Sequence, residues 1–141
     1  LSKNKFQQLK KENYFLETAV YNNNYYGTPK NQLADDKFII LEPQGLKSFL
    51  EKSECQVVAI YLKTKESIRI KRMTLRQDHQ EDIRKRIVSD REEFNLKKIQ
   101  GLDLVIDTTD ISLSDLADKI YFSYIEILEK KKTNGKQLSL F

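Results

Sequence analysis

The chain is poor in the residues that build disulfide frameworks and metal cages. Its 141 residues include one cysteine, Cys55, and one histidine. A single cysteine cannot close an internal disulfide, which fits a reducing cytosol, and the few Cys and His residues cannot form a zinc cage. No apolar run approaches the roughly 18 residues that would span a membrane, and no signal segment opens the chain. These absences predict a cytoplasmic protein that binds neither zinc nor membrane.

What the chain does contain is an ordinary globular composition with a mild excess of positive charge. Hydrophobic residues make up 39%, charged residues 33%, and the formal net charge is +4. The length supports one domain with a core. The positive excess fits a partner that carries phosphates, but it does not distinguish a nucleotide from a nucleic acid, and by itself such an excess is usually a solvated surface.

Apolar runs alternate with helical patterns along the chain. Residues 15–21 have strand character, and continuous apolar runs at 38–41, 57–62 and 102–106 are typical of strands covered on both faces. Helical spacing predicts helices at 2–13, 46–52, 67–76, 80–98 and 112–131. Strands that alternate with helices predict an α/β domain with a mostly parallel sheet.

A carboxylate and two hydroxyl side chains lie close together in residues 15–29. Glu17 falls within the expected strand, and Tyr26 and Thr28 follow it across an asparagine-rich turn. A carboxylate can accept two hydrogen bonds from the N1–H and amino edge of guanine, and the hydroxyls can bind a phosphate or a base. The residues alone leave an alternative open, in which Glu17 faces solvent and Tyr26 belongs to the core.

A second carboxylate, Glu42, follows the apolar run 38–41 directly and precedes Pro43, Gln44 and Gly45. Open α/β sheets bind ligands at the carboxyl ends of their strands, so Glu42 is a candidate ligand-binding residue. The alternative is an ordinary surface carboxylate at the end of a strand.

Three arginines form the third candidate group. Arg72 and Arg76 are four residues apart and share a helix face, and Arg86 follows an acidic interval. Guanidinium groups bind phosphate oxygens through a two-pronged fork, and phosphoryl transfer needs positive charge placed on the moving group. By itself, a pair of arginines at this spacing is usually a solvated helix face.

Together these segments resemble the guanylate kinase family. The family's GMP site reads F-(L/I)-E-x-A-x-(Y/F), then N-x-Y-G-(T/S), and here the segments are Phe15–Tyr21 and Asn24–Thr28. Arg72–Arg76 resembles the family's R-L-x-x-R, and the match continues to about Lys131. The resemblance implies a phosphate-loop kinase three-layer fold over residues 1–131, with a GMP-binding subdomain at about 1–36 and a lid at about 72–86.

The resemblance also implies a role for each matched residue on the GMP side. Glu17 and Thr28 would read guanine, and Tyr26 would contact the GMP phosphate. Glu42 stands where the family usually has an aspartate, so it would help to hold GMP with a shifted geometry. The implied activity is the phosphorylation of GMP or dGMP by ATP with Mg²⁺.

On the ATP side the resemblance assigns the arginines and one threonine. Arg72, Arg76 and Arg86 would clamp the ATP phosphates when the lid closes and stabilise the transferring phosphoryl group. Thr108 takes the place of the family's asparagine near adenine, a position that supports the fold more than a specific contact.

The family's phosphate loop, G-x-x-x-x-G-K-(S/T), is absent from the chain. In the family it holds the ATP phosphates and Mg²⁺, and its feeding strand is central to the sheet. Loss of a central strand would leave sheet edges unpaired, so we expect an upstream segment and do not expect residues 1–141 to form the native enzyme alone. The rival interpretation is a protein-binding module without turnover, which the missing loop favours and the retained arginines oppose.

The last residues, Gln137–Phe141, read Q-L-S-L-F and resemble the peptide by which bacterial replication and repair proteins dock on the sliding clamp. Leu138, Leu140 and Phe141 would fill an apolar pocket, Gln137 would hydrogen-bond at its edge, and residues 132–141 would form a flexible tail. Chance, or packing of these residues on their own domain, are the alternatives. The chain has no stripe of interleaved basic and aromatic residues, so we do not expect it to bind nucleic acid directly. Formation of a homodimer is left open.

Overall fold

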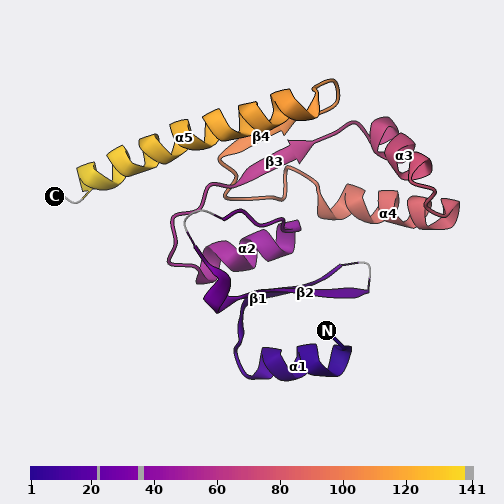
Figure 1. Ribbon diagram of the computed structural model, residues 1–141, viewed down its shortest axis with the longest axis horizontal. Helices are drawn as coiled ribbons and strands as arrows, with labels where there is room; N and C mark the ends of the chain where they lie inside the picture. The colour runs from indigo at the N-terminus through magenta and orange to yellow at the C-terminus, as the bar shows by residue number, and fades with distance from the viewer. Residues whose placement is uncertain (22, 35–36, 139–141) are drawn as a thin grey trace. The chain divides into compact units, whose positions relative to one another are not determined.

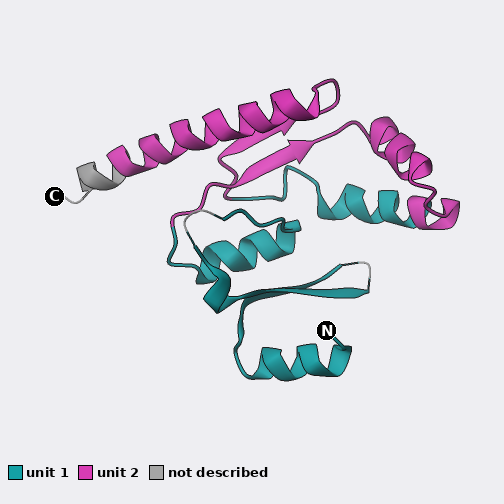
Figure 2. Ribbon diagram, in the orientation of Figure 1, with its two compact units in different colours: residues 1–55, 84–100 teal, residues 56–83, 101–141 magenta. Residues whose placement is uncertain are grey.

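The computed structural model describes residues 1–21, 23–34 and 37–138, with side chains as far as Thr133. The chain divides into two compact units, drawn in different colours in Figure 2. The first contains Leu1–Cys55 and Arg84–Gln100, and the second contains Gln56–Ile83 and Gly101–Phe141.

The first unit is built around a β-hairpin (Figure 1). Its elements are α1 (Lys3–Lys11), β1 (Phe15–Tyr21), β2 (Asn24–Pro29), the short 3₁₀ helix η1 (Lys30–Gln32), α2 (Pro43–Lys52) and the later part of α4 (Gln80–Glu93). Ser2 caps α1, because its hydroxyl accepts a hydrogen bond from the backbone N–H of Lys5 at 3.3 Å. The predicted first helix and first strand are therefore confirmed, each near its expected bounds.

The register of the hairpin decides which side chains meet. β1 and β2 are antiparallel and pair Glu17 with Thr28, Ala19 with Tyr26, and Tyr21 with Asn24. Successive side chains of a strand point to opposite faces, so all six of these residues lie on one face of the hairpin. Helix α2 packs against β1.

Aromatic side chains form much of the core of the first unit. Phe6, Phe15, Leu16 and Phe49 are buried, and the rings of Phe6 and Phe15 stack with their centroids 4.8 Å apart. Gly27 permits this arrangement, because a Cβ at that position would lie 2.8 Å from Cδ1 of Phe15.

The second unit contains a parallel pair of strands. β3 (Ile60–Lys63) pairs with β4 (Leu104–Asp107), and α3 (Glu66–Leu75) and α5 (Leu113–Leu138) complete the unit. Ile106 of β4 is 1% exposed. The predicted α/β class, with strands that alternate with helices and pair in parallel, is confirmed here. Helix α5 continues past the expected end at Lys131.

A polar clamp fixes α5 to the start of both strands in the second unit. The ammonium of Lys131 donates to Asp103 Oδ2 at 2.9 Å and to the carbonyl of Val57 at 2.6 Å. The same carboxylate oxygen of Asp103 accepts the backbone N–H of Ala59 at 2.8 Å. The ammonium of Lys131 and the carboxylate of Asp103 thus each have hydrogen-bond partners, as half-buried ions require.

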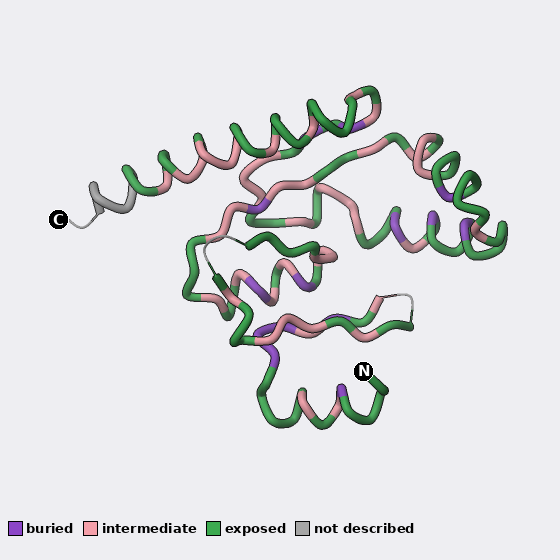
Figure 3. The backbone as a smooth tube through the Cα atoms, in the orientation of Figure 1, coloured by how far each residue is buried: buried purple, intermediate pink, exposed green. Residues whose placement is uncertain are grey.

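The expected strand at residues 38–41 is wrong for the structure described here. This segment has no strand assignment, and Phe38 and Ile40 are 91% and 93% exposed. An apolar run indicates that a segment can be buried. A strand also needs a neighbouring strand for its backbone hydrogen bonds, and no described strand pairs with this segment. The expected cover on both faces is also incomplete for β3 and β4, because Leu62 and Val105 are exposed (Figure 3).

Candidate functional site

The best-formed candidate site lies in the first unit, where β1 and β2 pair. The hydroxyl of Thr28 donates a hydrogen bond of 2.7 Å to Oε1 of Glu17. This contact follows from the register, since the two residues are direct cross-strand partners on one face of the hairpin. The structure therefore brings together two of the residues that the sequence assigned to guanine recognition.

The second carboxylate oxygen of Glu17 is the unusual atom of this site. Glu17 is 2% exposed, and Oε2 has no hydrogen-bond partner among the described residues. An unpartnered polar atom in a buried position is costly, because it has lost its water and gained no replacement. An ionised carboxylate is an acceptor only, so a group that completes this site must carry hydrogen-bond donors.

Glu42 lies beside Glu17 but has a structural function in this arrangement. It is the N-cap of α2, and its carboxylate accepts the backbone N–H groups of Gln44, at 2.8 Å, and of Gly45. Pro43 occupies the first helical position, where a missing N–H costs nothing. The N-terminus of α2 is thereby fixed next to the buried carboxylate of Glu17.

Gly45 separates the two carboxylates. A Cβ built on this glycine would lie 2.7 Å from Oε1 of Glu42 and 3.4 Å from Oε2 of Glu17. Both carboxylates therefore approach the same point of the α2 backbone, and any side chain at that point would displace the capping carboxylate.

Replacement of Gly45 by alanine tests this close approach. A Gly→Ala change inside a helix usually stabilises by about 1 kcal/mol. Here we expect the free energy of unfolding to fall by about 1–2 kcal/mol, because the new methyl group crowds the cap. Urea unfolding monitored by circular dichroism measures it, with Lys47→Ala on the same helix as the control. A Gly45→Ala variant that is more stable than the parent would contradict the geometry.

Tyr26 lies on the same hairpin face as Glu17 and Thr28, opposite Ala19, and is 50% exposed. Its side chain is thus half-exposed, on the same face as the buried pair. The hairpin brings Glu17, Thr28 and Tyr26 onto one face, and α2 brings Glu42 beside them.

The three arginines are placed on two different units. Arg72 and Arg76 belong to the second unit and Arg86 belongs to the first, so each is described within its own unit. The exposed Arg72 guanidinium makes no hydrogen bond or ion pair with the described residues. Arg76 ends α3, and its guanidinium pairs with Asp78, with Nε donating to Oδ1 at 2.9 Å. That pairing raises the pKa of Arg76, chiefly through the hydrogen bond to Asp78.

Thr108 follows β4 and is 5% exposed. Its hydroxyl lies 2.6 Å from the hydroxyl of Thr64 and 3.3 Å from the carbonyl of Lys63, to which it donates. These bonds tie the carboxyl ends of β3 and β4 together. The hydroxyl of Thr108 is thus already engaged in hydrogen bonds, and the role expected of this position stays a prediction.

A cluster that the sequence did not reveal joins the end of β1 to α4. The hydroxyl of Tyr21 donates to Oδ1 of Asp90 at 2.7 Å, and Asp90 is 8% exposed. The guanidinium of Arg86 lies 5.8 Å from the centre of the Tyr21 ring, and the ring of Phe94 meets it edge-on at 6.3 Å. Tyr21 and Asp90 are 69 residues apart, so no local pattern predicts their contact.

This cluster makes the stability of the chain sensitive to alkaline pH. Burial, followed by the hydrogen bond to Asp90, raises the pKa of Tyr21 to about 12. Because the folded-state pKa exceeds the ordinary value of 10.0, the stabilisation is complete below pH 10 and is lost as the pH rises from 10 to 12. After solvent screening at this half-exposed site we expect a loss of about 1 kcal/mol.

The measurement is urea unfolding at pH 9 and at higher pH, compared with Tyr21→Phe, together with the ultraviolet titration of tyrosinate. The parent should lose stability over this window by more than the variant does. Equal pH dependence of the two proteins would contradict the assignment.

Residues 134–141, which hold the expected clamp-docking residues Gln137, Leu138, Leu140 and Phe141, lie outside the described side chains. Their role and the expected flexible tail stay predictions. Among the described residues no helix is long and apolar enough to cross a membrane. Within that same part of the chain, no group of three or more His, Cys, Asp or Glu side chains could hold a metal ion.

The arrangement of helices and strands, with a buried acceptor site on the hairpin, defines an α/β protein. In a comparison of folds, the crystal structure of guanylate kinase from Anaplasma phagocytophilum superposes with a TM-score of 0.61. The superposition covers 92% of this chain and 63% of that one, at 22% sequence identity. This likeness establishes the fold.

The sequence comparisons add the family. The guanylate kinase family model matches residues 1–122. The guanylate kinase of Rickettsia felis is 39% identical over 104 residues, which is 67% of this chain and 53% of that protein. The guanylate kinase of Mycoplasma genitalium is 34% identical over 100 residues, which is 65% of this chain and 42% of that protein. The chain belongs to the guanylate kinase family, and it spans about half the length of these curated relatives.

Proposed function

We propose that this chain is the GMP-recognising and lid-bearing part of a guanylate kinase that transfers a phosphoryl group from ATP to GMP or dGMP. The observation that carries the proposal is the carboxylate of Glu17. It is 2% exposed, its Oε1 is held by Thr28, and its Oε2 lacks a partner among the described residues. A buried acceptor in this state is a site prepared for a donor-bearing ligand.

Guanine supplies the donors that such an acceptor needs. Its N1–H and its exocyclic amino group point in the same direction, so one carboxylate can accept both hydrogen bonds. Adenine presents a bare acceptor nitrogen at the position of N1 and would leave the carboxylate unsatisfied, and this is the situation in which buried polar sites discriminate most strongly. Thr28 fixes the carboxylate, so its orientation is set before the base arrives.

The neighbouring residues support the same site. Glu42 and Gly45 bring the N-terminus of α2 next to Glu17, with the carboxylate of Glu42 engaged as the cap. Exposed Tyr26 offers a hydroxyl for the GMP phosphate on the same hairpin face. In this arrangement Glu42 acts mainly by positioning the helix, and Glu17 makes the direct contact with the base.

The arginines supply the positive charge that phosphoryl transfer requires. The Arg72 guanidinium has its donors available, whereas the Arg76 guanidinium is shared with Asp78 at the end of α3. We assign the first contact with the transferring phosphoryl group to Arg72, with Arg76 and Arg86 as further donors. Closure of the lid over both nucleotides would exclude water from the reaction.

The guanylate kinase family uses ATP and Mg²⁺, and Mg²⁺ neutralises phosphate charge when it is bound. The described residues contain no group of three or more metal-binding side chains, so they do not by themselves form a site for this ion. No step proposed for these residues therefore passes through the metal. Their part is to bind the base, to position the phosphate and to place guanidinium groups.

The test is a pair of measurements on the protein expressed from its complete reading frame. Calorimetry with GMP and AMP measures base recognition, and coupled ADP formation measures turnover. The proposal expects GMP to bind, AMP to bind at least about 100-fold more weakly, and ADP to form only when GMP is present. Absence of GMP binding would overturn it, and GMP binding without turnover would favour the non-catalytic binding module, with residues 137–141 as its docking peptide.

A further inference from the structure

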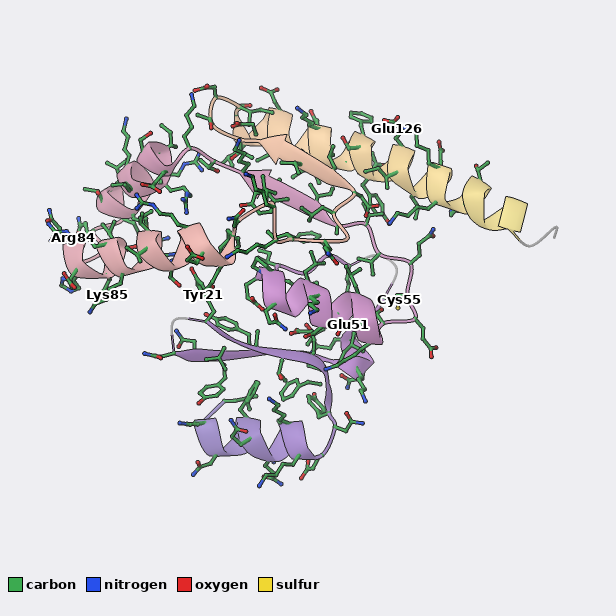
Figure 4. All side chains as sticks on the ribbon, turned by 180° about the vertical axis from the view of Figure 1, so that it is seen from behind. Tyr21, Glu51, Cys55, Arg84, Lys85 and Glu126 are labelled. Carbon is green, nitrogen blue, oxygen red and sulfur yellow. The ribbon has the colours of Figure 1, made fainter. Side chains whose placement is uncertain are left out.

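The cluster at the end of β1 contains a candidate catalytic side chain held by residues that have no assigned role. Arg86 lies over the ring of Tyr21, whose hydroxyl donates to the buried carboxylate of Asp90. Phe94 meets the same ring edge-on. Figure 4 labels Tyr21 and shows it between β1 and α4.

The spacing on α4 explains how one ring contacts three side chains. Arg86, Asp90 and Phe94 follow one another at intervals of four residues, so they lie on one face of the helix and its C-terminal end. The ring of Tyr21 packs along this face. The part of α4 that begins at Arg84, and the segment that follows the helix as far as Gln100, belong to the same compact unit as β1.

The position of Tyr21 on β1 connects this face to the proposed base site. Glu17, Ala19 and Tyr21 alternate along the strand and lie on one face of the hairpin. With a rise of about 3.3 Å per residue, Tyr21 lies roughly 13 Å along the strand from Glu17. This separation is comparable with the length of a nucleoside monophosphate.

We propose that Tyr21 is a positioning residue that holds the guanidinium of Arg86 beside the nucleotide-binding face of the strand that carries Glu17. The inference rests on the proposed functions of Glu17 and Arg86. It adds that Tyr21 connects the strand that carries Glu17 to the guanidinium of Arg86. The base-recognising carboxylate and one phosphate-binding guanidinium then lie in the same compact unit.

The chemistry of the cluster accounts for a tyrosine at this position. The hydroxyl satisfies the buried carboxylate of Asp90, which fixes α4 against the strand. The ring face attracts the guanidinium of Arg86 and limits its conformations before a phosphate is bound. A phenylalanine would keep only the second contact, and a leucine would keep neither.

Steady-state kinetics of the protein from its complete reading frame separate positioning from simple support of the fold. We expect Tyr21→Leu to lower kcat about tenfold and to leave the KM for GMP within about twofold, since a misplaced catalytic group slows the chemical step and spares the binding of the base. Tyr21→Phe should lower kcat by a smaller factor. Tyr14→Phe, on a tyrosine at the start of the same hairpin, is the matched control and should behave like the parent.

The Arg86→Ala background gives the decisive comparison. If Tyr21 acts through Arg86, adding Tyr21→Leu to Arg86→Ala should cause no further fall in kcat. A fall as large as in the parent background would mean that Tyr21 supports the fold only, and would overturn the proposal. If Tyr21→Leu does not fold, the same cycle is run with Tyr21→Met, which also removes the aromatic ring and keeps a side chain of similar length.

A second readout does not depend on kinase activity. The side-chain NMR signals of Arg86 should carry an upfield ring-current shift, which Tyr21→Leu removes and Tyr14→Phe leaves intact. Absence of turnover in the parent would contradict the proposed function, while the NMR shift would still report whether Tyr21 holds Arg86. Unchanged Arg86 signals in Tyr21→Leu would overturn the positioning proposal.

Discussion

Replacement of Glu17 by glutamine is expected to weaken GMP binding by about 100-fold or more and at the same time to stabilise the folded chain. Glutamine has one acceptor oxygen where the carboxylate has two, and its amide N–H groups face the donors of guanine. A buried site built for hydrogen bonding loses most of its affinity when the pairing fails. Calorimetry with GMP measures this loss.

The same substitution should change stability in the opposite direction to affinity. Oε2 of Glu17 is buried without a partner among the described residues, whereas Oε1 is bound by Thr28. Glutamine can keep the bond from Thr28 and removes the buried charge, so we expect the free energy of unfolding to rise by about 1 kcal/mol.

Glu51→Gln is the matched control for Glu17→Gln. Glu51 lies on α2, is exposed and is labelled in Figure 4. The same chemical change there should alter neither GMP affinity nor stability. A Glu17→Gln variant that binds GMP as well as Glu51→Gln does would show that the buried carboxylate is not the base-recognising group.

Replacement of Arg72 by alanine is expected to lower kcat about 10³-fold and to leave the calorimetric affinity for GMP close to that of the parent. A guanidinium that stabilises charge on the transferring phosphoryl group contributes on this scale, and it does so only in the transition state. Arg72→Lys should recover little, because an ammonium lacks the planar fork. Stopped-time assays of GMP-dependent ADP formation measure kcat.

The neighbouring Lys71 provides the control for Arg72. It lies on the same exposed stretch of α3, so Lys71→Ala removes one positive charge without removing the fork. Equal losses in the two variants would mean that only the overall charge of the helix matters. A fall in GMP affinity as large as the fall in kcat would place Arg72 in substrate binding, against the proposal.

The sequence predicted the first strand and the turn after it because local chemistry decides them, whereas the second strand and its pairing come from the structure. The asparagine-rich turn closes the hairpin, with Asn23 at a positive φ of 60°. Once the turn is fixed, the period of two in a strand places Glu17 opposite Thr28. The family resemblance then gave this pair a role, and the structure supplies the burial that sequence alone could not.

The start of α2 has a signal in the sequence that helical periodicity alone does not show. Pro43 at the first helical position, after a side chain able to cap, indicates a helix that begins earlier than the expected residue 46. The structure begins α2 at Pro43 and turns the carboxylate of Glu42 inward to the helix. Glu42, which the apolar run 38–41 predicts to follow a strand, is the N-cap of a helix.

Two features could not be obtained from sequence for physical reasons. A strand at residues 38–41 required a partner, and hydrophobicity reports nothing about one. The bond between Tyr21 and Asp90 depends on how α4 packs on β1, and neither residue carries a local signature of that contact. Sequence patterns constrain neighbours along the chain, whereas both features depend on neighbours in space.

The exposed apolar segment at residues 38–41 has a consequence for the behaviour of this chain in concentrated solution. Phe38 and Ile40 are almost entirely exposed, and the segment is short, β-prone and free of charge. Such a segment can template the addition of an extended chain and so promote aggregation. Lys37 before it, and Glu42 and Pro43 after it, act as gatekeepers that oppose stacking. Colloidal stability of the chain therefore depends on these flanking residues, and neutralising their charges is expected to promote aggregation.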